Sequence, residues 1–413
     1  MPGPTPTPFE IHVPDSLLGF IHDRVRTARL PPPVAHPDGK AAMYGVTHEA
    51  MTALQDHWNN RYNWRAVEDR LNSSLKQFSV PILHEGEDLN IHFVHHRSPQ
   101  PDAIPLIFVH GWPGSFLEVE KIITLLTHPP SEKAQAFHVV APSLPGIGFS
   151  SAPKSKNFGP EKIAGVFHKL MMILGYDHYV SQGGDWGSMI CRCLAVDHPK
   201  ACLGVHLNFI LALPPSALKN PLELFYLATR WMTAHQKKMI ERMIWWRQEE
   251  SGYADMMSTK PMTIAFALVD SPLGFAAWIR EKIDSLVDGY EWTEDEIISF
   301  CMMYILPGNS AFANLYKEGF VELKANILKR VIPSEVCFGA SCFPKGLYVG
   351  YCTPGWAKCR VAENIVFWRE HSKGGHFASL ETPDALVEDI RDFSDKIGSE
   401  SWKKLIHAGS EKH

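Results

Sequence analysis

Residues 179–196, YVSQGGDWGSMICRCLAV, hold the strongest local pattern in the chain. The segment opens with an apolar run typical of a buried strand and closes with a run typical of a helix. Between the two runs, Gly183, Gly187 and Ser188 are small enough for the tight, strained turn of a nucleophile elbow. Asp185 occupies the nucleophile position of that turn. The pattern predicts a reactive carboxylate at the carboxyl end of a strand. A glycine-rich helix start with Asp185 as a simple N-cap is the competing interpretation.

An aspartate in this position, in place of a serine, limits the chemistry. A carboxylate that attacks a saturated carbon forms an ester, which water can later cleave at the ester carbonyl. A serine would instead form an ether, which a hydrolase cannot easily cleave. Asp185 therefore predicts a substrate whose electrophilic centre is an sp³ carbon, such as an epoxide or an alkyl halide.

Short apolar runs that end in Gly or Pro alternate with helix-like stretches from Leu106 onward. This alternation is typical of an α/β fold with a mostly parallel sheet covered by helices on both faces. Functional groups are expected at the carboxyl ends of such strands. The predicted divisions are an N-terminal extension (1–105), a first core segment (106–213), a helical lid (214–332) and a second core segment (333–413).

The extension and the lid are predicted from different patterns. In the extension, residues 16–31 and 48–73 have apolar residues at helical spacing, and residues 89–98 predict one strand. Between about Pro214 and Val331 no strand pattern occurs, and helical stretches rich in Trp, Met and Phe fill the interval. A helical block between two parts of one sheet predicts a lid over the active face.

Composition excludes several other classes of protein. The net charge of −5 gives no reason to expect nucleic acid or an anionic membrane as a partner. No apolar run approaches the roughly 18 to 20 residues that span a bilayer, and the N-terminus lacks the basic and apolar regions of a signal peptide. The eight cysteines suit neither a disulfide framework nor a metal knuckle. We therefore expect a soluble, cytoplasmic protein with reduced thiols and no metal.

Two further motifs complete a catalytic pattern around Asp185. HGWPGS, residues 110–115, follows a predicted strand, and the backbone N–H groups of Trp112 and Trp186 are expected to form an oxyanion hole. GGHFASLETP, residues 374–383, is a glycine-flanked loop that places His376 as general base for the ester-cleaving water. A nucleophile that precedes the histidine along the chain matches the order found in α/β-hydrolases.

Together these motifs resemble the microsomal-type epoxide hydrolases of the α/β-hydrolase superfamily, especially the soluble fungal ones. FEIHVPDSLLGFIHDRV, NWRAVEDRLN, HGWPGS, PSLPGIGFS, GGDWGS and GGHFASLE occur in the family's order over nearly the whole chain. The resemblance implies two lid tyrosines that protonate the epoxide oxygen. SGYADMMSTKP assigns that role to Tyr253, and NLYKEGF assigns it to Tyr316, with Tyr304 as a nearby competitor. A phenol with a pKa of about 10 stays protonated at neutral pH and can still donate to an alkoxide.

One feature departs from the family pattern. Where the family has an Asp or Glu that orients the histidine, SCFPKGLYVG places Gly346. Glu363 and Glu370 are substitutes only by their closeness in sequence. The alternative position for the acid holds Asn208 and Phe209. In the serine-protease template, loss of this acid costs roughly 10⁴-fold in rate.

The favoured function is hydrolysis of an apolar epoxide to a vicinal diol, without metal or organic cofactor and with neither nucleic acid nor membrane as partner. The resemblance is also compatible with a homodimer. Three alternatives stay open: an isomerase or cyclase that opens epoxides with weakened hydrolysis, a non-catalytic ligand-binding homologue, and a haloalkane dehalogenase. The missing acid favours the first two. The tyrosine pair suits an alkoxide leaving group better than a halide.

Overall fold

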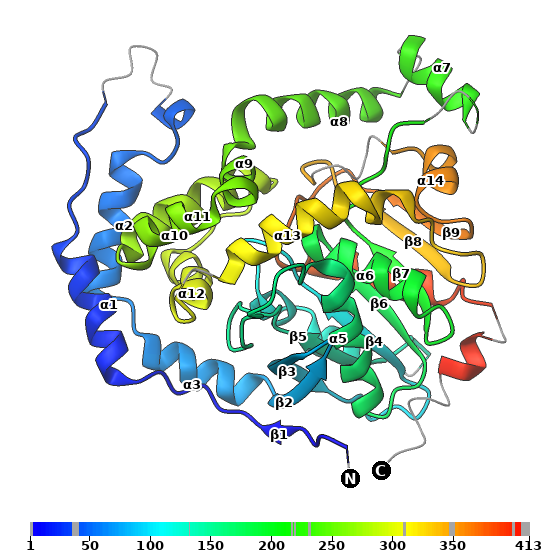
Figure 1. Ribbon diagram of the computed structural model, residues 1–413, viewed down its shortest axis with the longest axis horizontal. Helices are drawn as coiled ribbons and strands as arrows, with labels where there is room; N and C mark the ends of the chain where they lie inside the picture. Colours follow the sequence, from blue (N-terminus) through cyan, green and yellow to red (C-terminus); the bar gives the residue numbers. More distant parts are fainter. Residues whose placement is uncertain are drawn as a thin grey trace.

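The computed structural model describes residues 3–34, 41–131, 133–215, 218, 220–229, 233–308, 311–346, 352–398 and 401–405. Within these residues one sheet of nine strands forms the centre of the molecule, in the order β1-β2-β3-β5-β4-β6-β7-β8-β9 (Figure 1). The strands are β1 (Thr7–Pro8), β2 (Gln77–His84), β3 (Glu87–His96), β4 (Ile104–Val109), β5 (Phe137–Pro142), β6 (Tyr179–Gly183), β7 (Cys202–Leu207), β8 (Cys337–Cys342) and β9 (Ile365–Glu370).

The sheet is parallel from β5 to β9 and antiparallel from β1 to β5. Every residue of β4 to β8 is buried, which explains why these strands are largely apolar. The predicted α/β fold with a mostly parallel sheet is confirmed. Strands β2 and β3, which come from the N-terminal extension, continue the same sheet rather than standing apart from it.

Helices cover both faces of the sheet. On one face α5 (Pro160–Ile173) and α6 (Asp185–Asp197) contact each other, and on the other α4 (Ile123–Thr127) contacts α16 (Pro383–Ser394). The small helices of the core are η2 (Phe116–Val119), η4 (Ile327–Lys329), α14 (Pro354–Arg360) and α15 (Ala378–Glu381). Glycines in β7 and β8 allow α16 to pack closely, since a Cβ at Gly339 would lie 2.5 Å from the Phe393 ring.

A helical segment separates β7 from β8. Its elements are α7 (Pro221–Thr229), α8 (Ala234–Trp245), a π-helical turn η3 (Trp246–Glu250), α9 (Gly252–Thr259), α10 (Pro261–Val269), α11 (Pro272–Leu286), α12 (Glu294–Ile305) and α13 (Ala311–Ala325). Figure 1 shows α13 beside α6, above the sheet. The segment therefore covers the place where the chain turns from β6 into α6.

The N-terminal extension runs along the sheet and then beside the helical segment that separates β7 from β8 (Figure 1). That segment corresponds to the predicted lid. The extension contains α1 (Asp15–Thr27), η1 (Ala41–Tyr44), α2 (His48–Asn60) and α3 (Trp64–Ser74), and both α1 and α2 contact α11. The sequence predicted one amphipathic stretch over residues 48–73, but the structure divides it into two helices. The break lies at Asn63, whose side chain accepts hydrogen bonds from the N–H groups of Arg65 and Ala66 and so begins a new helix.

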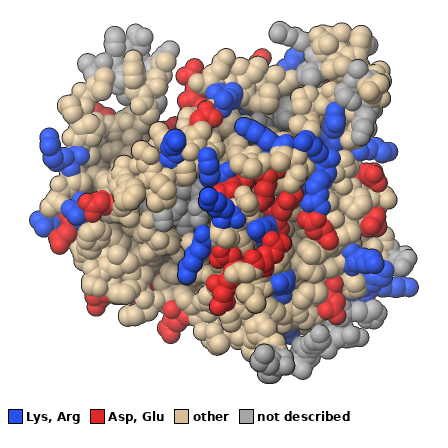
Figure 2. Space-filling view, viewed as in Figure 1, with Lys and Arg blue, Asp and Glu red and all other residues tan. Residues whose placement is uncertain are grey.

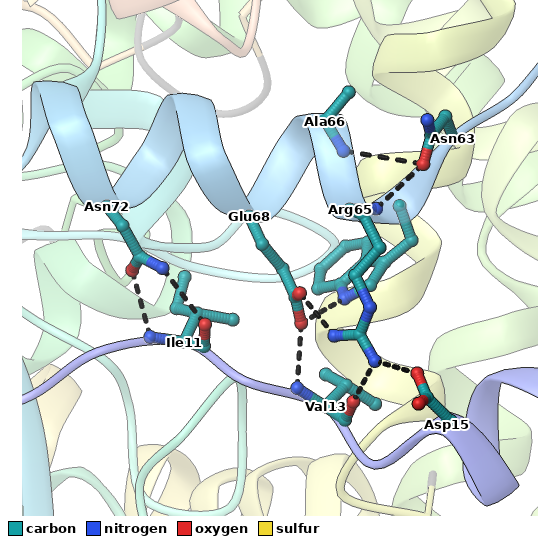
Figure 3. A network of polar contacts seen from close by, with 9 residues as sticks. Ile11, Val13, Asp15, Asn63, Arg65, Ala66, Glu68 and Asn72 are labelled. Carbon is teal, nitrogen blue, oxygen red and sulfur yellow. Dashed lines mark hydrogen bonds and ion pairs between the residues drawn. The ribbon is translucent and has the colours of Figure 1, made fainter.

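A buried carboxylate fastens the N-terminal segment to α3 (Figure 3). Glu68 accepts hydrogen bonds from the Val13 N–H at 2.7 Å and the Trp64 indole N–H at 2.6 Å. Arg65 bonds both to Glu68 and to Asp15. One residue set thus joins the chain before α1 to the helix that precedes β2.

The structure also shows how charge is distributed over one face of the molecule and how the cysteines are placed. Figure 2 shows Lys and Arg interspersed with Asp and Glu on the face in view, rather than gathered into a patch of one sign. None of the eight cysteines, all of which the structure describes, forms a disulfide. Among the helices that the structure describes, none combines the length and the apolar character needed to cross a bilayer.

Candidate active site

Asp185 lies at a strained turn between β6 and α6. Its φ is +49°, in the left-handed region that non-glycine residues rarely adopt. The turn fits only because its neighbours are small: a Cβ on Gly187 would lie 1.9 Å from the Val109 carbonyl oxygen, and one on Gly183 would lie 2.7 Å from the Gly187 backbone. Ser188 Oγ donates to the Asp185 carbonyl at 2.6 Å. The turn therefore has the geometry of a nucleophile elbow.

The Asp185 carboxylate faces the loop after β4. Oδ1 accepts the backbone N–H of Trp112 at 2.9 Å, and the N-cap of α6 is Gly184. The interpretation of Asp185 as a simple N-cap is therefore wrong. The loop can come this close because a Cβ on Gly111 would lie 2.4 Å from the Asp185 side chain.

Burial raises the pKa of Asp185 to about 6, while backbone hydrogen bonds from Trp112 and Trp186 lower it. Two expected oxyanion-hole amides thus act on the resting carboxylate. At neutral pH the side chain is largely ionised, as a nucleophile must be.

His376 faces the same carboxylate from the loop after β9. Its Nε2 lies 3.7 Å from Asp185 Oδ2, and its backbone N–H donates to the Leu286 carbonyl at 3.0 Å. Burial, and next the charge of Arg242, lower the pKa of His376 to about 4. The imidazole is therefore neutral at pH 7 and able to accept a proton.

Two carboxylates that the sequence analysis missed fix the His376 loop through its backbone. Asp288 accepts the Gly374 N–H at 3.0 Å, and Glu381 accepts the N–H groups of Phe377 at 2.9 Å and Asp288 at 2.8 Å. The signal for Glu381 was its place at the end of the GGHFASLE motif. Asp288 is distant in sequence and gave no signal.

Tyr253 on α9 and Tyr316 on α13 lie together over Trp112 and Trp186. Their ring centroids are 5.9 Å apart. Tyr253 stacks on Trp112 with centroids 4.7 Å apart, and Tyr316 meets Trp186 edge-on at 5.2 Å. Burial, followed by the neighbouring Tyr253 and Asp185, raises the pKa of Tyr316 well above its ordinary value, so its phenol stays protonated. The structure thus brings both predicted tyrosines to Asp185.

Tyr304, the competing tyrosine, has a different place. It is buried in α12, and its hydroxyl donates to the Gly114 carbonyl at 2.5 Å. This hydrogen bond connects α12 to the HGWPGS loop. The pair of tyrosines that borders the cavity over Asp185 is Tyr253 and Tyr316.

A cavity of about 170 Å³ is bordered by Asp185, Tyr253 and Tyr316. Asp185 and the two tyrosines form its reactive side, and Arg247 and Asp255 contribute an ion pair at 3.2 Å. The rest of its wall is largely apolar and includes Met189, Phe209, Leu211, Trp246, Phe320 and Leu323. A larger cavity of about 460 Å³ lies between the N-terminal extension and α11, but Asp185 does not line it.

Glu118, at the end of the HGWPGSFLE segment, is another functional candidate that the sequence analysis missed. Burial, and then the nearby Asp185 carboxylate, raise the pKa of Glu118 to about 8. Its carboxyl lies against Gly114, where a Cβ would be 1.7 Å from Glu118 Oε1. A largely protonated carboxyl therefore lies near the nucleophile at neutral pH.

Among the described residues, Asp185 is the one carboxylate within ion-pair distance of the His376 side chain. Glu363 and Glu370 are exposed, at opposite ends of β9, and no hydrogen bond or ion pair within the described part of the chain joins either to His376. Asn208 accepts a hydrogen bond from Gln182 at 3.0 Å, and Phe209 meets the His376 ring edge-on at 6.2 Å. Among the described residues, the structure identifies no triad acid.

Comparison with known proteins shows which family has this sequence pattern and fold. The family model "Epoxide hydrolase N terminus" matches residues 6–119, and the model for the alpha/beta hydrolase fold matches residues 104–232. Epoxide hydrolase 1 of Sus scrofa is 34% identical over 418 residues, which cover 94% of this chain and 88% of the relative. The chain belongs to the epoxide hydrolase family.

Two solved structures agree with this membership. The epoxide hydrolase of Aspergillus niger matches with a TM-score of 0.83 and 34% identity, covering 95% of this chain and 97% of that one. The juvenile hormone epoxide hydrolase of Bombyx mori matches with a TM-score of 0.85 and 26% identity, covering 98% and 96%. The resemblance inferred from the motifs is confirmed at the level of family and fold.

Proposed function

We propose that this enzyme hydrolyses apolar epoxides to vicinal diols through an ester on Asp185. The observation that carries the proposal is that a nucleophile and two acids border one largely apolar cavity, with a base 3.7 Å from the nucleophile. Asp185 lies between the Trp112 amide and His376, and Tyr253 and Tyr316 border the same cavity. This arrangement suits attack on a saturated carbon whose leaving group is an alkoxide.

In the first step an oxygen of Asp185 forms a bond to an epoxide carbon. The carbon–oxygen bond of the ring breaks, and the oxygen takes a proton from Tyr253 or Tyr316. Because an alkoxide is far more basic than a phenolate, this proton transfer is downhill. The product of the step is an alkyl ester of Asp185 with a free hydroxyl on the neighbouring carbon.

In the second step His376 accepts a proton from water, and the water oxygen attacks the carbonyl carbon of the ester. The N–H groups of Trp112 and Trp186 stabilise the oxyanion that develops. Collapse breaks the carbonyl carbon–alkoxy oxygen bond, and the leaving oxygen takes the proton from His376. The diol departs, and the carboxylic acid left on Asp185 gives up its remaining proton while the phenolate formed in the first step takes one up. Asp185 thus returns as a carboxylate and both tyrosines as phenols.

An epoxide-opening isomerase or cyclase is the second candidate. The lack of a described carboxylate bonded to His376 favours it, because slow ester hydrolysis leaves time for an internal hydroxyl to act. Product analysis on simple aryl and alkyl epoxides separates the two functions, since the first yields diols and the second yields isomers or cyclic ethers. Epoxide consumption without diol would contradict the proposed hydrolysis.

Replacement of the proposed base tests the two-step order. The His376→Ala enzyme is expected to form the ester and to cleave it at least about 100-fold more slowly, because general-base catalysis supplies that much. Intact mass after incubation with an epoxide should therefore show an increase equal to the mass of the substrate. Asp185→Ala is the control and should show no adduct. An unmodified mass for His376→Ala after long incubation would contradict the role of His376.

A further inference from the structure

The charge of one guanidinium, that of Arg242, acts on the proposed base, in a chain that has Gly346 where the resemblance implies an acid. Arg242 on α8 donates from Nη2 to the Ser285 carbonyl at 2.9 Å. The backbone N–H of His376 donates to the next carbonyl, that of Leu286, at 3.0 Å. Arg242 and His376 are thus anchored on consecutive residues at the end of α11.

Arg242 also reaches the loop that ends at Gly346. Its Nε donates to the Lys345 carbonyl at 3.1 Å, and the Lys345 N–H donates to the Gly374 carbonyl at 3.0 Å. Gly374 is two residues before His376, so these bonds form a closed circuit. These hydrogen bonds link the lid, the loop after β8 and the loop after β9. Arg242 is the residue of α8 that takes part in them.

The charged groups around these hydrogen bonds act either on the His376 side chain or on the backbone of its loop. Asp185 and Arg242 act on His376. The acidic groups nearby, Asp288 and Glu381, bond backbone N–H groups of the loop. Together with Glu250, these two carboxylates favour the charged form of Arg242, against the burial that lowers its pKa. The guanidinium is therefore held by carbonyl groups and by acids that do not bond the imidazole.

We propose that Arg242 is a positioning residue for cleavage of the ester: it fixes the lid and both loops in the arrangement that places His376 over the Asp185 ester. The inference rests on the proposed two-step function. A carboxylate hydrogen-bonded to the imidazole would normally hold the ring in place. Here backbone bonds position the loop, and loss of Arg242 removes the bonds from α8 to Ser285 and to Lys345.

The expected effect is confined to the second step. Ester formation depends on Asp185 and the tyrosines, whereas ester cleavage depends on the position of His376, and a shift of about 1 Å can cost on the order of 100-fold. Arg242→Ala should therefore slow ester decay by about 10- to 100-fold and leave the rate constant of ester formation nearly unchanged. Arg242→Lys keeps the charge and one donor, so its ester should decay at an intermediate rate.

The experiment follows ester formation and decay in a single turnover, by intact mass on samples quenched after mixing full-length enzyme with styrene oxide. Lys238→Ala is the matched control, because Lys238 lies one turn earlier on α8 and is exposed. Partial unfolding of a variant would reduce the amplitude of both phases without changing their rate constants, so a merely structural role gives a different result.

Each outcome bears on a different claim. Ester that decays at the wild-type rate in Arg242→Ala, or formation and decay slowed equally, would overturn the role of Arg242. Consumption of epoxide by the wild-type enzyme without any ester would overturn the proposed covalent function itself. Slow decay in Arg242→Ala alone, with partial recovery in Arg242→Lys, is the result we expect.

Discussion

At the scale of single residues, Asp185 combines a strained backbone with a carboxylate that is costly to bury. Its φ is positive, and its side chain accepts the backbone N–H of Trp112. Burial raises the pKa of the carboxylate, and the two backbone amides limit the rise. In the proposed mechanism these amides later face the oxyanion of the ester-cleaving step. The same donors would then both favour the ionised carboxylate and serve the second half of the proposed reaction.

This balance predicts the acid limb of the pH profile. Ring opening needs ionised Asp185, whose pKa is raised to about 6, so kcat/KM should fall about tenfold for each pH unit below 6. His376, with a pKa lowered to about 4, stays neutral over most of that range and does not limit the rate. Initial rates between pH 4.5 and 8 give the midpoint. A midpoint near 4, typical of an ordinary aspartate, would show that the carboxylate is not buried as described.

At the scale of elements, the N-terminal segment depends on one buried side chain. Glu68 is 3% exposed and satisfies the N–H groups of Val13 and Trp64 together with the Arg65 guanidinium. The segment that it holds leads into α1, which contacts lid helix α11. Glu68 therefore connects α3, which precedes β2, to the segment before α1, and α1 in turn contacts α11.

Removal of this carboxylate should loosen the extension. Glu68→Ala leaves buried donors without partners, which costs about 2 to 4 kcal/mol in the free energy of unfolding. Urea denaturation measures the loss, and amide exchange at Ile11 and Val13 should increase. Asp69→Ala is the control, because Asp69 is the next residue of α3 and is exposed. Equal stability of the two variants would show that the network contributes nothing.

Local patterns predicted the secondary structure around Asp185. The strand-to-helix turn at Asp185, the glycine loop of HGWPGS and the helical segment after β7 each follow from residues close together in sequence. The antiparallel addition of β2 to the sheet and the break at Asn63 did not. Strand pairing is a long-range property, and a helix break at a capping residue is hidden when apolar residues keep their spacing across it.

At the scale of the whole molecule, the active site is assembled from distant parts of the chain. Asp185, His376, Tyr253 and Tyr316 were predicted from motifs, and the structure brings all four together, although their roles stay predictions. Arg242, Asp288 and Glu381 act through backbone groups that only the folded chain places side by side. No sequence pattern marks such contacts, because their partners are carbonyl and amide groups common to every residue.

The fold thus divides the proposed reaction between its layers. The sheet and α6 present the nucleophile, the lid brings the acids, and the loop after β9, fastened to α11, brings the base. The central claim is that Asp185 forms a covalent ester and that water attacks the carbonyl carbon of this ester. Such attack leaves one water oxygen in the protein.

A single turnover in ¹⁸O-water, followed by mass analysis of the peptide that contains Asp185, tests this claim most directly. We predict that ¹⁸O appears in the Asp185 carboxylate and that the diol of this first turnover carries none. Epoxide converted to ¹⁸O-labelled diol, with no label in Asp185, would contradict the covalent route and indicate direct attack of water on the epoxide.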